Sequence, residues 1–305
     1  MKLIIGSRGS PLALCQAEWV REKLKELYPE GQFLIKEIKT QGDKILDVAL
    51  ARVGGKGFFT KEIEESLLRG EIDLAAHSLK DLPTEIPPGL FLGAVTLRSE
   101  AHDVLVSKDA LNLSQLPEGA KIGTSSLRRR AQLLKFRPDF QVMDLRGNLN
   151  TRLRKLRELD LNAIVIAGAG LKRMGEEDRI TEIIPFSIIL PAAGQGALGI
   201  EIREGNTEIK EMVAKLDDRD SRVETEAERS FLEKLGGGCQ VPVGALGQLR
   251  KGNLSLQGII LSLDGRGSVQ SELTGKAEDA RNLGERLAEE LLASGGAEML
   301  KEVIS

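Results

Sequence analysis

Residues 120–136 of this chain read AKIGTSSLRRRAQLLKF, and this stretch predicts a strand, a loop and a helix in direct succession. We expect the strand at residues 120–123 and the helix at 127–136. Thr124, Ser125 and Ser126 fall between them, where hydroxyl groups suit the start of a helix. Strands that alternate with helices in this way indicate the α/β fold class.

The same order of elements is expected in the first part of the chain. A strand at residues 2–6 leads to a helix with Ser10 as its N-cap and Pro11 at its first position. Strands at 33–39 and 72–76 follow, with a helix between them. This alternation predicts parallel strands, whose carboxyl ends bring the polar residues that follow them to one edge of the sheet.

The opening stretch belongs to a second α/β unit, with further strands expected at residues 103–107, 141–145 and 163–167. Residues 190–200 have neither helical nor strand periodicity and contain many small side chains, so we expect a hinge there. From residue 221 onward, one helix, three strands and a final helix predict a separate, small α+β domain.

The composition of the 305 residues excludes several classes of protein. The 43 Lys and Arg and the 46 Asp and Glu give a net charge of −3, which excludes a protein that holds nucleic acid by bulk charge. Two Cys and two His are too few for a disulfide scaffold and argue against a structural zinc site. The sequence has no membrane-length apolar run and no signal-peptide core. We therefore expect a cytoplasmic protein without a metal, a membrane segment or a nucleic-acid partner.

Positive charge is concentrated in residues 128–157, which hold ten basic and two acidic side chains for a net +8, while the rest of the chain carries −11. Arg128 and Arg129 lie in the first turn of the predicted helix, where cations are unfavourable to the helix dipole, so we expect an anion to compensate them. Arg146 follows another strand, and Arg8 precedes the first helix. These groups predict binding of carboxylates or phosphates on both sides of a cleft between the α/β units.

Two single residues stand out as chemical groups. Asp81 follows the strand at 72–76 in an apolar segment, where we expect partial burial. Such a carboxylate could stabilise developing positive charge or move protons, although Asp-Leu-Pro is also an ordinary surface turn. Cys239 follows three glycines and precedes Gln-Val-Pro, so it is presented on a loop, as nucleophilic or attachment thiols are. His77 is interpreted as a packed structural histidine.

Eight motifs, in this order, make the chain resemble the porphobilinogen deaminase family, also called the hydroxymethylbilane synthases. Together they span essentially the whole chain, which makes the resemblance specific. The motifs are RGSPLAL (8–14), VGGKG (53–57), HSLKD (77–81), GTSSLRR (123–129), LRGN (145–148), AGLKR (169–173), GQG (194–196) and GGCQVP (237–242).

The resemblance implies three domains and a monomer. Residues 1–97 with 195–215, and residues 98–194, would form two α/β domains like those of periplasmic binding proteins, with the active-site cleft between them. Residues 216–305 would form a small α+β domain that carries the cofactor cysteine.

The resemblance also implies a transferase of tetrapyrrole (heme) biosynthesis, with a dipyrromethane cofactor joined to Cys239 by a thioether. Four molecules of porphobilinogen would be added head to tail to this primer with release of ammonia, and hydroxymethylbilane would be released by hydrolysis. By resemblance, Asp81 is the catalytic residue. It would accept hydrogen bonds from pyrrole N–H groups and stabilise the cation that forms when ammonia leaves.

The resemblance assigns the remaining site residues position by position. Those expected to bind the cofactor, together with Asp81, are Ser78, Lys80, Thr124, Ser126, Arg128, Arg129 and Arg146. Those expected to bind the substrate and the growing chain are Arg8, Ser10, Gln16, Arg146, Arg152, Arg173 and Gln195. Phe59 is expected to stack over the site, and the glycine-rich loop around Lys56 is expected to act as a mobile cover.

Two other functions stay open from the residues alone. A non-catalytic, two-domain anion-binding protein would use the same cleft but would have no use for Cys239. A nucleic-acid-binding module on residues 128–157 would bind with a steep salt dependence, and we expect almost no such binding.

Overall fold

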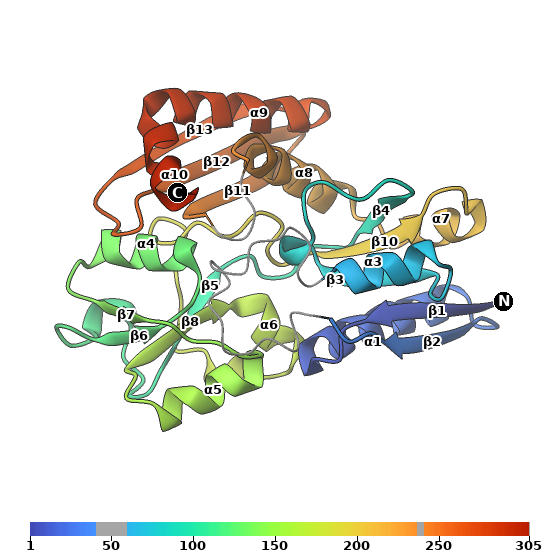
Figure 1. The fold of residues 1–305 in the computed structure, drawn as a ribbon, viewed down its shortest axis with the longest axis horizontal. Helices are drawn as coiled ribbons and strands as arrows, with labels where there is room; N and C mark the ends of the chain where they lie inside the picture. Colours follow the sequence, from blue (N-terminus) through green and yellow to red (C-terminus); the bar gives the residue numbers. More distant parts are fainter. Residues whose placement is uncertain (41–59, 237–240, 305) are drawn as a thin grey trace. The chain divides into compact units, whose positions relative to one another are not determined.

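The computed structural model describes residues 1–40, 60–236 and 241–304. The chain divides into two compact units, and each can be followed by itself in Figure 1. Unit 1 comprises Met1–Ser99 and Ala197–Arg222, and unit 2 comprises Glu100–Gly196 and Val223–Ser305. The chain therefore passes from unit 1 to unit 2, returns to unit 1, and enters unit 2 again.

Unit 1 is built on a five-stranded sheet made of β1 (Lys2–Ser7), β2 (Gln32–Glu37), β3 (Leu74–Ser78), β4 (Leu90–Val95) and β10 (Leu198–Arg203). Their order is β2-β1-β3-β10-β4. β1 pairs in parallel with β2 and β3, as the alternation of strands and helices predicts. β10 runs antiparallel to both β3 and β4, and it enters this sheet only after the chain has passed through unit 2.

Helices cover both faces of this sheet. Leu74 and Ala76 of β3 belong to the core under α1 (Pro11–Leu27) and α7 (Thr207–Ala214), whereas Ala75 belongs to the core under α3 (Lys61–Leu68). α1 begins as predicted, with Pro11 first and the Ser10 hydroxyl accepting a hydrogen bond from the backbone N–H of Ala13 over 3.3 Å.

The first sheet of unit 2 repeats this arrangement with β5 (Asp103–Ser107), β6 (Lys121–Gly123), β7 (Gln141–Met143), β8 (Ala163–Ala167) and β9 (Glu182–Ile183). Their order is β7-β6-β8-β5-β9. β6 is parallel to β7 and β8, and β5 is antiparallel to β8 and β9. Three helices follow the three parallel strands in turn, namely α4 (Leu127–Phe136), α5 (Leu149–Glu158) and α6 (Gly168–Arg173).

The expected α/β fold class is confirmed, because each of these sheets contains three parallel strands, β2-β1-β3 or β7-β6-β8, and strands alternate with helices along the chain. The helix expected at residues 127–136 is α4, and the strand expected at 163–167 is β8. The expectation for residues 190–200 is wrong in its last part, where β10 begins at Leu198. The crossing between the units ends before this point, and the strand starts at once.

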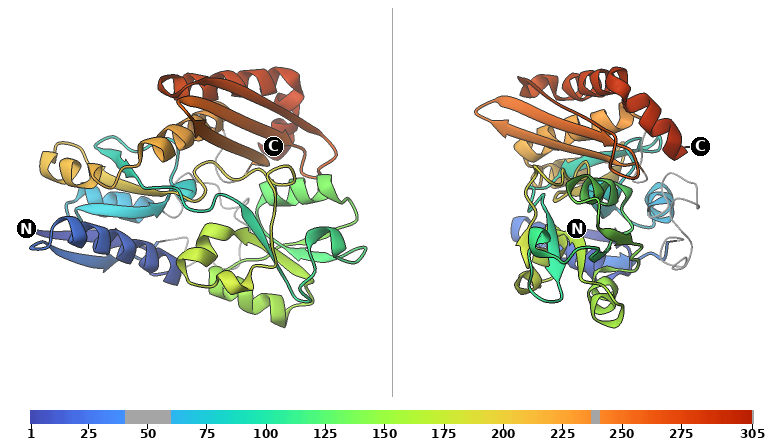
Figure 2. Two further views of the ribbon diagram at one scale, coloured as in Figure 1. Left: turned by 180° about the vertical axis from the view of Figure 1, so that it is seen from behind. Right: turned by 90° about the vertical axis from the view of Figure 1, so that its left-hand side faces the viewer.

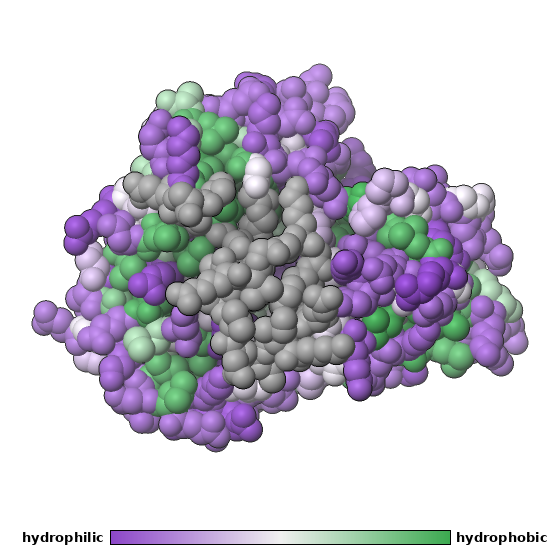
Figure 3. All heavy atoms as spheres, in the orientation of Figure 1, coloured by the Kyte–Doolittle hydropathy of each residue, from purple (hydrophilic) through white to green (hydrophobic). Residues whose placement is uncertain are grey.

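The second sheet of unit 2 is antiparallel and consists of β11 (Val243–Arg250), β12 (Asn253–Leu261) and β13 (Ser268–Lys276). Its core is shared with α8 (Arg219–Lys234), α9 (Ala280–Leu291) and α10 (Ala297–Ile304), and α9 runs along the sheet in Figure 2. Leu283, Leu287 and Leu291 of α9 are buried, whereas its outer side is hydrophilic (Figure 3). This is the small α+β part expected at the carboxyl end. The three expected domain boundaries stay a prediction.

A cluster of titratable groups is buried in unit 1. His77 Nε2 on β3 lies 3.1 Å from Glu201 Oε2 on β10, and the two residues are 6% and 0% exposed. Glu64 on α3 is also buried, and within the described part of the chain its Oε1 atom and that of Glu201 have no hydrogen-bond partner. Burial raises the pKa of Glu64, an effect that the Thr60 hydroxyl offsets in part and the Glu201 charge reinforces. His77 is thus a packed histidine, as the sequence analysis interprets it.

Replacement of Glu64 by Gln is expected to stabilise the protein at neutral pH, because Gln has nearly the same shape and carries no charge to bury. Folding raises the pKa of Glu64, so the native state binds its proton more tightly than the unfolded chain. The stability that this group contributes is therefore full below its ordinary pKa of 4.5 and is lost as pH rises through the raised value.

Urea unfolding of the wild type and Glu64→Gln, from below pH 4.5 to above neutrality, checks this expectation. The variant should gain in unfolding free energy relative to the wild type as pH rises. Glu65→Gln is the control, because Glu65 is the next residue and its side chain is 47% exposed. A gain that does not grow with pH would contradict the burial argument.

Candidate functional site

Polar residues gather where the parallel strands of unit 1 end. A cavity of about 70 Å³ is lined there by the loop between β1 and α1, the first turns of α1, the start of α3 and the end of β3. It brings together five predicted site residues, which are Arg8, Ser10, Gln16, Ser78 and Asp81. The sheet explains this grouping, because β1 and β3 are parallel neighbours and their carboxyl ends share one edge.

The polar groups on one side of the cavity are held in place by neighbouring elements. Gln16 on α1 is 3% exposed, and its Nε2 donates to the Ser78 hydroxyl at the end of β3 over 2.8 Å. Ser10 caps α1, and Arg8 lies in the same loop. A guanidinium beside the amino-terminal end of a helix is suited to binding a carboxylate.

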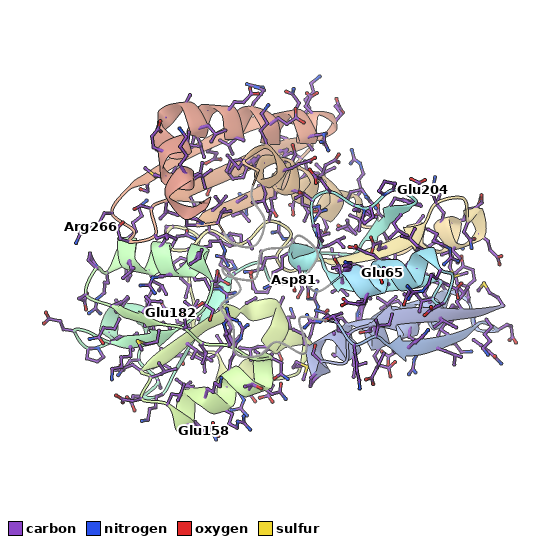
Figure 4. The ribbon with its side chains drawn as sticks, in the orientation of Figure 1. Glu65, Asp81, Glu158, Glu182, Glu204 and Arg266 are labelled. Carbon is purple, nitrogen blue, oxygen red and sulfur yellow. The ribbon has the colours of Figure 1, made fainter. Side chains whose placement is uncertain are left out.

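Asp81 ends the short 3₁₀ helix η2 (Leu79–Asp81), which directly follows β3 (Figure 4). Leu79 and Leu82 are buried, at 0% and 3% exposed, but Asp81 is exposed. The expectation of partial burial is therefore wrong for this residue, because the short helix turns its apolar neighbours into the core and leaves the carboxylate at the cavity. Lys80 is half-buried and does not line the described part of the cavity.

In unit 2, the loop between β6 and α4 has the form that the sequence predicts. Ser126 is the N-cap of α4, and its hydroxyl accepts a hydrogen bond from the backbone N–H of Arg129 over 3.4 Å. The Ser125 hydroxyl donates to the Leu145 carbonyl over 2.9 Å, which joins this loop to the segment after β7. Thr124 is 4% exposed, and its hydroxyl accepts from the backbone N–H of Ser126. Hydroxyl groups are thus fixed at the carboxyl end of β6.

Arg128 and Arg129 are 4% and 5% exposed, and both pair with the fully buried carboxylate of Asp103 at the start of β5. Arg128 Nη1 donates to Asp103 Oδ2 over 2.6 Å. Arg129 Nη2 and Nε donate to Oδ1 over 2.7 and 3.0 Å. Burial alone would raise the pKa of Asp103, but the charges of the two arginines hold it well below its ordinary value. Asp103 thus supplies an anion of the kind expected to compensate them.

Gln195 completes the surroundings of Asp103. It is fully buried, and its Nε2 donates to Asp103 Oδ1 over 3.0 Å and to the Ala101 carbonyl over 2.8 Å. Asp103 was not predicted as a site residue, because it lies 25 residues before Arg128, inside an expected strand. An acidic residue at the head of the apolar run Asp-Val-Leu-Val was the available signal.

The other three predicted arginines of unit 2 are half-buried. Arg152 on α5 donates from Nε to the Gly147 carbonyl over 2.8 Å, so it lies at the turn that also contains Arg146. Arg173 at the end of α6 donates from Nη2 to the carbonyl of Gly196, the residue after Gln195, over 2.6 Å. The predicted residues of unit 2 therefore cluster after β6, after β7 and around residues 195–196.

Three residues singled out by the sequence, Lys56, Phe59 and Cys239, lie outside the described residues. Within residues 1–40, 60–236 and 241–304, no group of three or more His, Cys, Asp or Glu side chains could hold a metal ion. In the same part of the chain, every helix is too short or too polar to cross a membrane.

Two family models match the chain. The model of the dipyrromethane cofactor binding domain of porphobilinogen deaminase matches residues 3–211, and that of the C-terminal domain of the same enzyme matches residues 222–293. A porphobilinogen deaminase of Pelotomaculum thermopropionicum is 54% identical over 300 residues, which cover 98% of this chain and 96% of the relative. One of Desulforudis audaxviator is 52% identical over 302 residues, which cover 99% and 98%.

Solved structures of binding proteins are similar at much lower identity. The methionine-binding protein MetQ is 13% identical with a TM-score of 0.46, and the similarity covers 70% of this chain and 89% of that chain. An extracellular-binding protein of a probable amino-acid ABC transporter from Bacillus subtilis is 13% identical with a TM-score of 0.39, over 71% and 90%.

The two family models together match nearly all of the chain. The two curated relatives are enzymes, and they match 98% and 99% of the chain. The alternative of a non-catalytic anion-binding protein is therefore not favoured. The chain belongs to the porphobilinogen deaminase family, a family of transferases, and residues 3–211 form its dipyrromethane cofactor-binding domain.

Proposed function

We propose that this enzyme joins four porphobilinogen molecules head to tail onto a dipyrromethane primer and then releases hydroxymethylbilane by hydrolysis, in tetrapyrrole (heme) biosynthesis. Its family supports this reaction. In the chain itself, the proposal rests on the cavity of unit 1, where Arg8, Gln16, Ser78 and Asp81 line one space. Each porphobilinogen carries an acetate and a propionate group, so cations and N–H donors suit it as a ligand.

The residues of unit 2 fit an anionic cofactor. Two buried guanidinium groups share one carboxylate there, so the set keeps a net positive charge that a carboxylate of the cofactor would balance. When bound, the dipyrromethane supplies the free α-carbon to which the first substrate is joined. We propose that its carboxylates are held by Ser78, Lys80, Thr124, Ser126, Arg128, Arg129 and Arg146. The residues proposed for the substrate and growing chain are Arg8, Ser10, Gln16, Arg146, Arg152, Arg173 and Gln195.

Asp81 is the residue proposed to assist the chemistry. Ammonia leaves the aminomethyl carbon of porphobilinogen, and the positive charge that remains is shared with the pyrrole nitrogen. A carbon–carbon bond then forms at this carbon, and the attacking α-carbon loses its proton, so that one ammonia is released for each ring added. The carboxylate of Asp81 would accept hydrogen bonds from pyrrole N–H groups and stabilise the positive charge. Its place at the cavity, on the turn after β3, supports this role.

Cys239 is proposed to carry the cofactor through a thioether, on the support of its sequence setting between three glycines and Gln-Val-Pro. A cytoplasmic location, a monomeric state and the absence of a nucleic-acid partner stay predictions from the sequence.

Asp81→Asn is expected to fold and to keep its cofactor, because the side chain is exposed. It should form hydroxymethylbilane about 10²–10³-fold more slowly, as an enzyme does when it loses one group that stabilises charge in the transition state. A bilane assay and the intact mass check the two expectations. Asp109→Asn, at an exposed aspartate in the turn after β5, should keep wild-type activity. Near-normal rates in Asp81→Asn would remove this residue from the mechanism.

Cys239→Ala is expected to lack the cofactor entirely, because no other atom is proposed to bond to it. The wild type should weigh more than its sequence by two porphobilinogen units less two ammonia molecules, and the variant should weigh what its sequence predicts. Cys15→Ala is the matched control, since Cys15 is a half-buried residue of α1, and this variant should keep the added mass. Added mass on Cys239→Ala would refute the attachment role.

A further inference from the structure

Asp103 accepts hydrogen bonds from Arg128, Arg129 and Gln195, and the contacts of these three residues connect α4, β8 and the segment that holds Leu190 and Gln195. Arg128 and Arg129 come from α4, and Gln195 comes from the segment that follows residue 190. Arg128 Nη1 also donates to the Leu190 carbonyl over 2.6 Å, and Arg129 Nη1 donates to the Val165 carbonyl of β8 over 3.2 Å. The carboxylate is therefore the centre of the contacts that hold both guanidinium groups.

The charges of this set do not cancel. Arg128 and Arg129 lie in the first turn of α4, and both are buried. Loss of solvent, repulsion between the two cations and the helix dipole all make this arrangement unfavourable. Asp103 provides one negative charge, and the Leu190 and Val165 carbonyls are neutral. The described set of Arg128, Arg129 and Asp103 thus carries one positive charge in excess.

We infer that Asp103 is a positioning residue: it is the internal counter-ion that holds Arg128 and Arg129 in place before the dipyrromethane is bound, and it leaves one positive charge for a carboxylate of that group. The inference rests on the proposed function, in which these arginines bind the cofactor. It assigns to Asp103 no contact with the reacting atoms.

This role couples Asp103 to the cofactor. Without the Asp103 charge, the set of Arg128, Arg129 and residue 103 in the apo protein has two buried cations and no anion. In the loaded protein, a carboxylate of the cofactor compensates part of this positive charge. The apo protein should therefore lose more stability than the loaded protein. If Asp103 served the fold alone, the two forms would lose the same amount, because independent effects add.

The test compares the apo and loaded forms of the wild type, Asp103→Asn and Asp139→Asn. The apo proteins are produced in cells that make no porphobilinogen, part of each is then loaded with porphobilinogen, and the intact mass reports the loading. Thermal unfolding gives a Tm for each form. Asp139 is a matched control, because it pairs with Arg137 just beyond the other end of α4, with Nη2 and Oδ2 2.6 Å apart.

In Asp103→Asn, the difference in Tm between the loaded and apo forms should exceed that of the wild type by at least about 5 °C. It should be unchanged in Asp139→Asn. Failure of folded apo Asp103→Asn to gain mass, where Asp139→Asn gains it, would also support the inference. A difference in Tm that is unchanged or smaller in Asp103→Asn, or that widens equally in Asp139→Asn, would overturn it.

The inference can be tested even if apo Asp103→Asn does not fold. If apo Asp103→Asn does not fold, soluble variant is expected only from cells that supply porphobilinogen, and insolubility in both kinds of cell would overturn the inference. A wild type that gains no mass from porphobilinogen would instead refute the proposed function, and the inference with it.

Discussion

Parallel pairing of short, buried strands is the constraint on which the rest of the structure depends. Ile5 of β1 pairs with Leu74 of β3, so the residues that follow these two strands have to share one edge of the sheet. Gly123 of β6 pairs with Met143 of β7, which brings the hydroxyl-rich start of α4 beside the segment that leads to Arg146. The cavity of unit 1 and the arginine cluster of unit 2 are two products of this one geometric rule.

The elements that could be predicted from the sequence are those with local signals. α1 and α4 have hydroxyl caps at their first turns, and β8 is a short apolar run, so propensity and pattern agree with the final structure. β10 was missed although Leu198, Ile200 and Ile202 alternate with other residues, because the alternation is short and its first half was grouped with the small residues before it. Its antiparallel direction follows from where the chain comes back into unit 1, and that is a property of the whole fold.

In the candidate site, too, features with a local sequence signal were predicted and contacts between distant residues were not. Motifs located the residues of the unit 1 cavity because each motif sits at the end of a strand or the start of a helix. The partners of buried charges were missed, since Asp103 and Arg128 are 25 residues apart and His77 and Glu201 are 124 apart. Nothing local encodes such pairs. The exposure of Asp81 was also mispredicted, because a single 3₁₀ turn decides which of its residues face the core.

The position of β10 between β3 and β4 has a consequence for folding during synthesis on the ribosome. Among the described strands, β4 pairs in that sheet with β10 alone, so this pairing cannot form until Leu198–Arg203 has been translated. By then all five strands of the first sheet of unit 2 have been translated. The sheet whose strands are made first is therefore completed only after the first sheet of unit 2.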